Sequence, residues 1–206
     1  MSSKRARWTT VLLALWVLFC AFWLFLPLSI DPASTLPDDG DALQATWMMA
    51  WVAHQLPRNP TELFDANVYF PHPKGLAYSE HFIPQGVVVG LLMSLGCNLI
   101  LAYNLLAALT LVAIALAVRL WTRELGANEI GASVAGVICA LSTFSLGEVS
   151  RLHILFMQWI PLGLFFLHRF FKTGRTWSAV AFAGCCVLQG LSSHYYLISL
   201  PLFLGP

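Results

Sequence analysis

Long uncharged apolar runs alternate with short polar segments along this chain. Residues 9–30 carry no charged side chain, and about 20 apolar residues suffice for a helix to cross the hydrocarbon core of a bilayer. Further apolar runs predict spans at residues 99–118, 130–147, 152–167 and 176–193. The pattern therefore predicts an all-α protein, a polytopic transmembrane helical bundle.

The second apolar run, residues 82–118, is too long for one span. As a straight helix it would reach about 55 Å, well beyond the thickness of the core. The sequence Gly96-Cys97-Asn98 is the natural place for a break. Two alternatives follow: a hairpin that crosses twice, or an interfacial or re-entrant piece at 83–95 followed by a single span at 99–118.

The positive charges of the loops separate these alternatives, because cytoplasmic loops carry an excess of Lys and Arg. With the N-terminus in the cytoplasm and a single crossing, the cytoplasmic side receives mostly cations: Lys4, Arg5, Arg7, Arg119, Arg123, Arg169, Lys172 and Arg175. The outer side receives most of the acids: Asp31, Asp38, Asp39, Asp41, Glu62, Asp65, Glu80 and Glu148. The hairpin would export the cations at 169, 172 and 175. We therefore expect a single crossing and an extracytoplasmic loop over residues 31–81.

Composition supports the membrane assignment and leaves two questions about the chain ends. The chain is 58% hydrophobic with a mean hydropathy of +0.73, above the usual apolar share of soluble domains. The basic start MSSKRAR suits a signal peptide, but no small-x-small cleavage site follows and the run is long, so we favour a retained anchor. The last residues, 198–206, are too short to cross again. We expect residues 1–206 to be the N-terminal part of one membrane domain; the alternative is a membrane partner that completes the bundle.

Acidic residues crowd at the start of the outer loop, in LPDDGDALQATW. Asp41 followed three residues later by Gln44 predicts a capping box that opens a helix running to residue 56. Trp47 and Trp51 share one face of that amphipathic helix, which suits a position in the membrane interface. A carboxylate fixed at a helix start also suits a catalytic base. Asp39 and its neighbour Asp38 form a solvated turn or bind a divalent cation.

Other ionisable residues assigned to the outer side are candidates for a site. Lys74, on a PHPKG turn, offers a cation to a phosphate group. The short segment GEVSRLH places Glu148, Arg151 and His153 at a membrane boundary, where Glu148 and Arg151 either pair at i, i+3 or act in function. All histidines except His168 fall on or near the predicted outer side. The small net charge of +1 indicates no nucleic-acid partner.

A family resemblance follows from this layout of spans and loops and from three phrases in the sequence: GDALQATWMMAWVAHQL, LFDANVYFPHPKGLAYSEH and RLHILFMQWIPL. The chain resembles the C-type glycosyltransferase superfamily, specifically a poorly characterised branch of bacterial membrane proteins, over roughly residues 10–200. These enzymes use polyprenyl-phosphate-linked sugars. The second outer loop departs from the superfamily in lacking an Asp-x-Asp pair, and the later spans are absent.

The resemblance implies roles for the outer residues. Asp41 would be the essential acid of the first outer loop, with Asp39 as the alternative, and Glu148 the second carboxylate; Asp41 and Glu148 would hold any divalent cation. Arg151 or Lys74 would grip the donor phosphate. We also expect His81 and His153 to contact the substrate.

The expected function is transfer of a sugar from a lipid-linked donor to an extracytoplasmic acceptor at the bacterial plasma membrane. Two other classes stay open: a transporter or cation-binding membrane protein, and a non-enzymatic assembly subunit. Transport needs ionisable residues near the middle of the membrane, and the centres of the predicted spans carry none, which argues against it.

Overall fold

The computed structural model describes residues 3–196, Ile198 and Ser199, and within these residues every regular element is a helix. Three helical segments are long and apolar enough to cross a membrane: Leu99–Glu124, Glu129–Gly147 and Leu152–Thr173. The predicted all-α class and the membrane-type helices are confirmed at this level.

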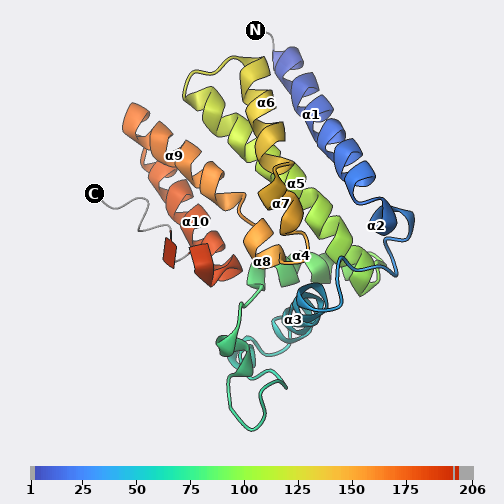
Figure 1. Ribbon diagram of the computed structural model, residues 1–206. Coiled ribbons are helices and arrows are strands. Elements are labelled where there is room, and N and C mark those ends of the chain that lie inside the picture. Colours follow the sequence, from blue (N-terminus) through green and yellow to red (C-terminus); the bar gives the residue numbers. More distant parts are fainter. Residues whose placement is uncertain (1–2, 197, 200–206) are drawn as a thin grey trace.

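One long helix organises the others. The long helices lie side by side (Figure 1): α1 (Ser3–Leu24), α5 (Leu99–Glu124), α6 (Glu129–Ala140), α9 (Trp159–Thr173) and α10 (Thr176–Ser192). Of these, α5 touches α1, α6 and α9, and its Tyr103 and Ile114 are fully buried. The core therefore forms around α5.

The break predicted in residues 82–118 is confirmed. Helix α4 (Ile83–Ser94) ends before Gly96, which adopts a positive φ of 97°. Asn98 then caps α5, because its Oδ1 accepts the N–H of Leu101 at 2.8 Å. Helix α4 packs on α3 (Asp41–Gln55), and the two lie together at one end of the long helices (Figure 1).

Three further interruptions were not predicted. The first predicted span, residues 9–30, divides at Phe25 into α1 and α2 (Leu26–Ile30). The span 130–147 divides where Ser142 caps α7 (Thr143–Gly147) by accepting the N–H of Ser145. The span 152–167 divides into α8 (Leu152–Leu155) and α9. The last two breaks flank the turn at 148–151, and thereby position its side chains.

Acidic and basic residues collect at opposite ends of the long helices. The α5–α6 and α9–α10 turns lie at one end, here the basic end, together with the start of α1 (Figure 1). The loop 31–82, with its short helices η1 (Pro60–Glu62) and η2 (Gly75–Tyr78), lies at the other, the acidic end, with the turn 148–151. The side chains at 4, 5 and 7 and the tail 200–206 lie outside the described residues.

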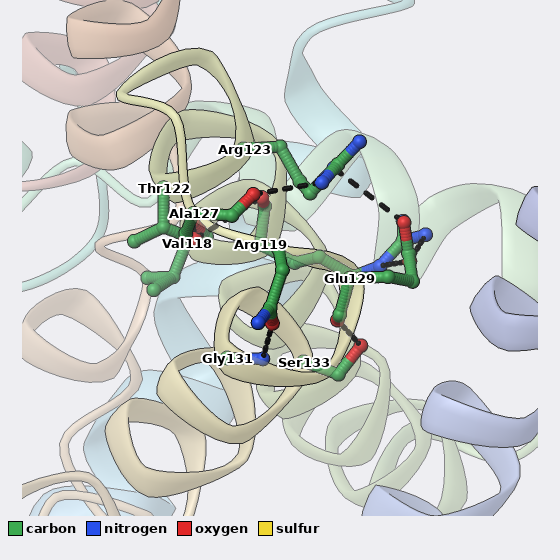
Figure 2. Close-up of polar contacts among 9 residues, drawn as sticks. Val118, Arg119, Thr122, Arg123, Ala127, Glu129, Gly131 and Ser133 are labelled. Carbon is green, nitrogen blue, oxygen red and sulfur yellow. Dashed lines mark hydrogen bonds and ion pairs between the residues drawn. The ribbon is translucent and has the colours of Figure 1, made fainter. Parts of the chain in front are cut away.

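A buried ion pair fastens the α5–α6 turn at the basic end. Arg119 binds Glu129, with its Nε donating to Oε1 at 2.9 Å, and Arg123 Nε lies 3.4 Å from the other oxygen of Glu129 (Figure 2). Arg123 also donates to the carbonyl of Ala127 at 2.7 Å, and Asn128 caps α6 through the N–H of Gly131. The turn is therefore held by charge and by hydrogen bonds.

Glycine permits the close contact between α5 and α6. A Cβ atom on Gly136 would lie 2.4 Å from the carbonyl oxygen of Ala115, so Gly136→Ala should force the helices apart and lower the free energy of unfolding by about 1–3 kcal/mol. Gly184 is the matched control: nothing lies within 4 Å of its Cβ position, so Gly184→Ala should leave stability unchanged or raise it by up to about 1 kcal/mol. Unfolding in mixed micelles followed by circular dichroism measures both. Equal effects of the two substitutions would contradict the close contact.

Candidate functional site

The acidic end is built on polar side chains at the start of α5. The hydroxyl of Tyr103 lies 2.8 Å from the carbonyl oxygen of Val149 and 3.0 Å from that of Ser150, and shares its proton between them. Asn104 Nδ2 donates to the carbonyls of Pro32 and Thr35, each at 2.8 Å. One turn of helix, with Tyr103 buried and Asn104 half-buried, therefore fixes the 32–35 segment and the 148–151 turn relative to each other.

The start of α3 differs from the capping box predicted from the sequence. Asp38, rather than Asp41, provides the carboxylate: its Oδ1 accepts the N–H groups of Gly40 at 2.8 Å and Ala42 at 3.1 Å. Partial burial raises the pKa of Asp38, but hydrogen bonds from the backbone of Ala42, Gly40 and Asp41 and from the side chain of Ser150 together outweigh it and hold that pKa below its ordinary value. Asp41 lies in the first turn of α3 with its side chain 59% exposed. The capping prediction was wrong because Asp38 and Asp41 can both cap the same helix start, and Asp38 does so. The Asp41 carboxylate is therefore not used in the cap.

Asp41 and Glu148 converge on one arginine. Arg151 Nη2 donates to Glu148 Oε1 at 2.9 Å, and Arg151 Nε lies 2.8 Å from Glu148 Oε2 and 3.9 Å from Asp41 Oδ2. The pairing of Glu148 with Arg151 at i, i+3 is the one weighed from the sequence. The contact with Asp41 brings the two predicted carboxylates, from distant segments, to the Nε atom of a single guanidinium group.

A cavity of about 530 Å³ opens beside this cluster. Its walls come from four segments, namely α3, the end of the first loop, the 151–154 segment and the residues after α10. The polar and aromatic lining residues are Asp41, Gln44, Tyr78, Ser79, Glu80, Arg151, His153, His194 and Tyr195. Among the residues predicted from the sequence, Asp41, Arg151 and His153 line the cavity, and Glu148 binds Arg151 without lining the cavity. A cavity with convergent polar groups is the default place to look for a ligand site.

The other predicted residues lie outside the cavity wall. Asp39 is exposed, and Lys74 is exposed on a tight turn whose backbone N–H binds Asp65 Oδ1 at 2.9 Å. His81 is packed between Phe64 and His194, with ring centroids 4.9 and 4.2 Å away. Burial, with a smaller contribution from His194, lowers the pKa of His81 to about 4. His81 therefore stays neutral at pH 7 and adjoins the site from behind His194.

The pair Glu80–His194 was missed as a unit by the sequence reasoning. Glu80 Oε2 accepts the backbone N–H of His194 at 2.7 Å and lies 3.4 Å from its Nδ1. Burial raises the pKa of Glu80, while the hydrogen bond and charge of His194 oppose that rise. No local pattern could join two positions so far apart in the chain.

The two carboxylates that the resemblance assigns to a metal both lie near an arginine in this arrangement. Arg151 pairs with both oxygen atoms of Glu148 and lies 3.9 Å from Asp41 Oδ2, so a cation held by both side chains would have to displace the guanidinium group. Within residues 3–196 and 198–199, no group of three or more His, Cys, Asp or Glu side chains is arranged to hold a metal ion.

Comparison with protein-family models, with curated proteins and with solved structures finds no match to this chain. Any functional conclusion therefore depends on the geometry of the acidic end.

Proposed function

We propose that the protein is an integral membrane glycosyltransferase, or the N-terminal part of one, that transfers a sugar from a polyprenyl-phosphate-linked donor to an extracytoplasmic acceptor. In this proposal the N-terminus faces the cytoplasm of a bacterial cell, the long helices cross the plasma membrane, and the acidic end faces outward. The observation that carries the proposal is the convergence of Asp41, Glu148 and Arg151 beside the cavity.

The cluster supplies the groups that such a transfer needs. Asp41, exposed at a rigid helix start, would orient or deprotonate an acceptor hydroxyl. The hydroxyl oxygen forms a bond to the anomeric carbon while the bond from that carbon to the phosphate oxygen breaks, and its electron pair leaves with the lipid phosphate. Arg151, held by Glu148, would neutralise the phosphate charge that develops.

An apolar groove near the cluster suits the lipid part of the donor. A cavity of about 270 Å³ runs between α1, α2 and α5 and is lined by Leu18, Phe22, Leu105 and Leu111. It reaches Val149, two residues before Arg151. A prenyl chain in this groove would bring its phosphate to the membrane surface close to the guanidinium group.

Reconstitution of the full chain in vesicles tests the proposal. Vesicles that contain polyprenyl-phosphate hexoses labelled in the sugar should transfer label to a glycan acceptor fraction, whereas vesicles without protein should not. No transfer from any hexose or pentose donor would overturn the proposed reaction. Uptake of divalent cations in its place would support the transporter alternative.

Cysteine labelling tests the proposed orientation separately. Glu62 is exposed in the outer loop, so a Glu62→Cys variant should react with a membrane-impermeant maleimide on intact cells above the background of the native cysteines. Reaction only after the cells are opened would place the acidic end in the cytoplasm and would remove the basis of the proposal.

A further inference from the structure

We infer that His194 is the general base of the proposed transfer and that Glu80 positions its imidazole ring. The inference rests on the proposed function and goes beyond it, because it decides which group in the cavity takes the proton from the acceptor hydroxyl. Asp41 is then left with the task of orienting that hydroxyl.

The geometry resembles the carboxylate–imidazole arrangement that activates nucleophiles in many enzymes. Glu80 ends the first outer loop with its side chain only 10% exposed, while His194, 36% exposed, lines the cavity. The carboxylate holds the backbone N–H of His194 at 2.7 Å and faces Nδ1 at 3.4 Å. A carboxylate at Nδ1 favours the tautomer with the proton on that atom, so Nε2 keeps a free electron pair.

The choice of His194 over Asp41 follows from their charged neighbours. Asp41 lies 3.9 Å from the Arg151 guanidinium, the group that faces the leaving phosphate in this proposal. An ordinary carboxylate holds a proton only below about pH 4, whereas imidazole does so up to about pH 6.5, closer to the working range of a base. Glu80 adds a negative charge beside His194 that stabilises an imidazolium cation once it forms.

The other ionisable groups around His194 do not take over this role. His81 meets the His194 ring edge to face at 4.2 Å, and burial holds the pKa of His81 at about 4, so it stays neutral. His153 stacks on Tyr195 on the 151–154 side of the cavity, next to Arg151. Asp41 and Arg151 complete the charged lining of the cavity. Among these histidines, only His194 has a carboxylate within 4.0 Å in the described residues.

The proton and electron balance of the step is complete without another reactant. The acceptor hydroxyl gives its proton to Nε2 of His194 as its oxygen bonds to the anomeric carbon. The carbon–oxygen bond to the phosphate breaks and both electrons leave with the polyprenyl phosphate, whose charge Arg151 faces. The imidazolium, stabilised by Glu80, then returns its proton to solvent.

Kinetics of the full chain in donor-loaded vesicles test the role of His194. His194→Ala should lower kcat by about 10²–10⁴-fold, the usual contribution of a general base, and added imidazole should restore part of the rate. The control is His54→Ala, because His54 is exposed on α3 and lies outside the cavity lining; it should keep the wild-type rate. A wild-type rate and pH profile in His194→Ala would overturn the inference. So would a loss of rate that imidazole cannot restore and that accompanies a loss of folding in both His194→Ala and His194→Gln, because His194 would then have a structural role.

A second measurement tests the positioning role of Glu80 without any assay of transfer. Glu80→Gln keeps an oxygen that can accept the His194 backbone N–H but removes the negative charge. Imidazole nitrogen and carbon chemical shifts of the labelled full chain should show His194 with its proton on Nδ1 in the wild type and a shift toward the Nε2 tautomer in Glu80→Gln. His54 shifts should not change. An unaltered His194 tautomer in Glu80→Gln would overturn the pairing of Glu80 with His194, even if the protein transfers sugar. The expected change of tautomer in a protein that transfers no sugar would instead support the pairing and overturn the proposed reaction.

Discussion

Replacing Glu129 with alanine should lower the free energy of unfolding by about 3–5 kcal/mol, because it leaves a buried arginine without its counter-charge. The Arg119 side chain is only 7% exposed, and Glu129 accepts hydrogen bonds from it (Figure 2). Arg123 Nε approaches the same carboxylate at 3.4 Å. Loss of Glu129 therefore removes the shared partner of two cations and leaves them next to each other. Denaturant unfolding in mixed micelles, followed by circular dichroism, measures the change.

A neighbouring ion pair provides the matched control. Glu124 lies 3.4 Å from Lys172 Nζ at the same end of the molecule, but the Lys172 side chain is 60% exposed and remains hydrated without its partner. Glu124→Ala should therefore change stability by less than about 1 kcal/mol. The double replacement Arg119→Met with Glu129→Leu should recover much of the stability lost in Glu129→Ala, because no buried charge is left unpaired. Arg123 also loses Glu129 in this variant, but its side chain is 41% exposed and remains hydrated. If Glu129→Ala were as mild as Glu124→Ala, the α5–α6 turn would be open to water.

Local signals were sufficient for the main helix break. Gly96 and Asn98 predicted the end of one helix and the start of the next, and the structure places a positive φ at Gly96 and a side-chain cap at Asn98. Such signals work because they act over three or four residues, the range of a helical hydrogen bond. The interruptions at Phe25 and at 156–158 carry no comparable Gly or Asn signal, so hydropathy merged each pair of helices into one run.

The α3 cap shows where local reasoning fails. Asp38 precedes the helix and Asp41 opens it, and aspartate is a favoured N-cap residue, so either side chain could cap the helix. The outcome depends on Asp38 Oδ1 accepting two N–H groups at once, from residues two and four positions later, and the spacing alone does not say which of the two local patterns wins.

The candidate site was predictable as a set of loop residues but not as a geometry. Asp41, Glu148 and Arg151 came from assigning two segments to one side of a membrane, and the structure brings them together. The same assignment also included Lys74 and Asp39, which lie outside the cavity, because sidedness alone does not say which loop residues turn inward. The contact of Glu80 with His194 depends on how the end of α10 meets the first loop, a tertiary feature without a local signature.

Replacing Asp41 with asparagine should lower the rate of sugar transfer by about 10²–10³-fold while membrane insertion and folding persist. Asparagine keeps the size of the side chain but removes the charge that faces Arg151 at 3.9 Å and a hydrogen-bond acceptor for the acceptor hydroxyl. Folding should persist because Asp38 makes the cap of α3. Loss of a first-turn carboxylate changes stability by only about 0.3–1 kcal/mol through the helix dipole. Transfer of labelled sugar in vesicles, with protein content matched by quantitative blotting, measures the effect.

The comparison of Asp41 with other acids of the same loop separates a specific role from a general charge effect. Glu62→Gln removes an equal charge from an exposed position in η1, outside the cavity, and should leave the rate unchanged. Asp39→Asn should reduce transfer much less than Asp41→Asn, because Asp39 does not line the cavity. Equal losses in Asp39→Asn and Asp41→Asn would mean that the loop attracts its substrate through summed charge, in which case the losses should shrink together as salt is raised. A loss confined to Asp41→Asn and independent of salt would instead require direct contact at the carboxylate, since salt screens a contact at hydrogen-bond distance far less than it screens attraction over longer distances.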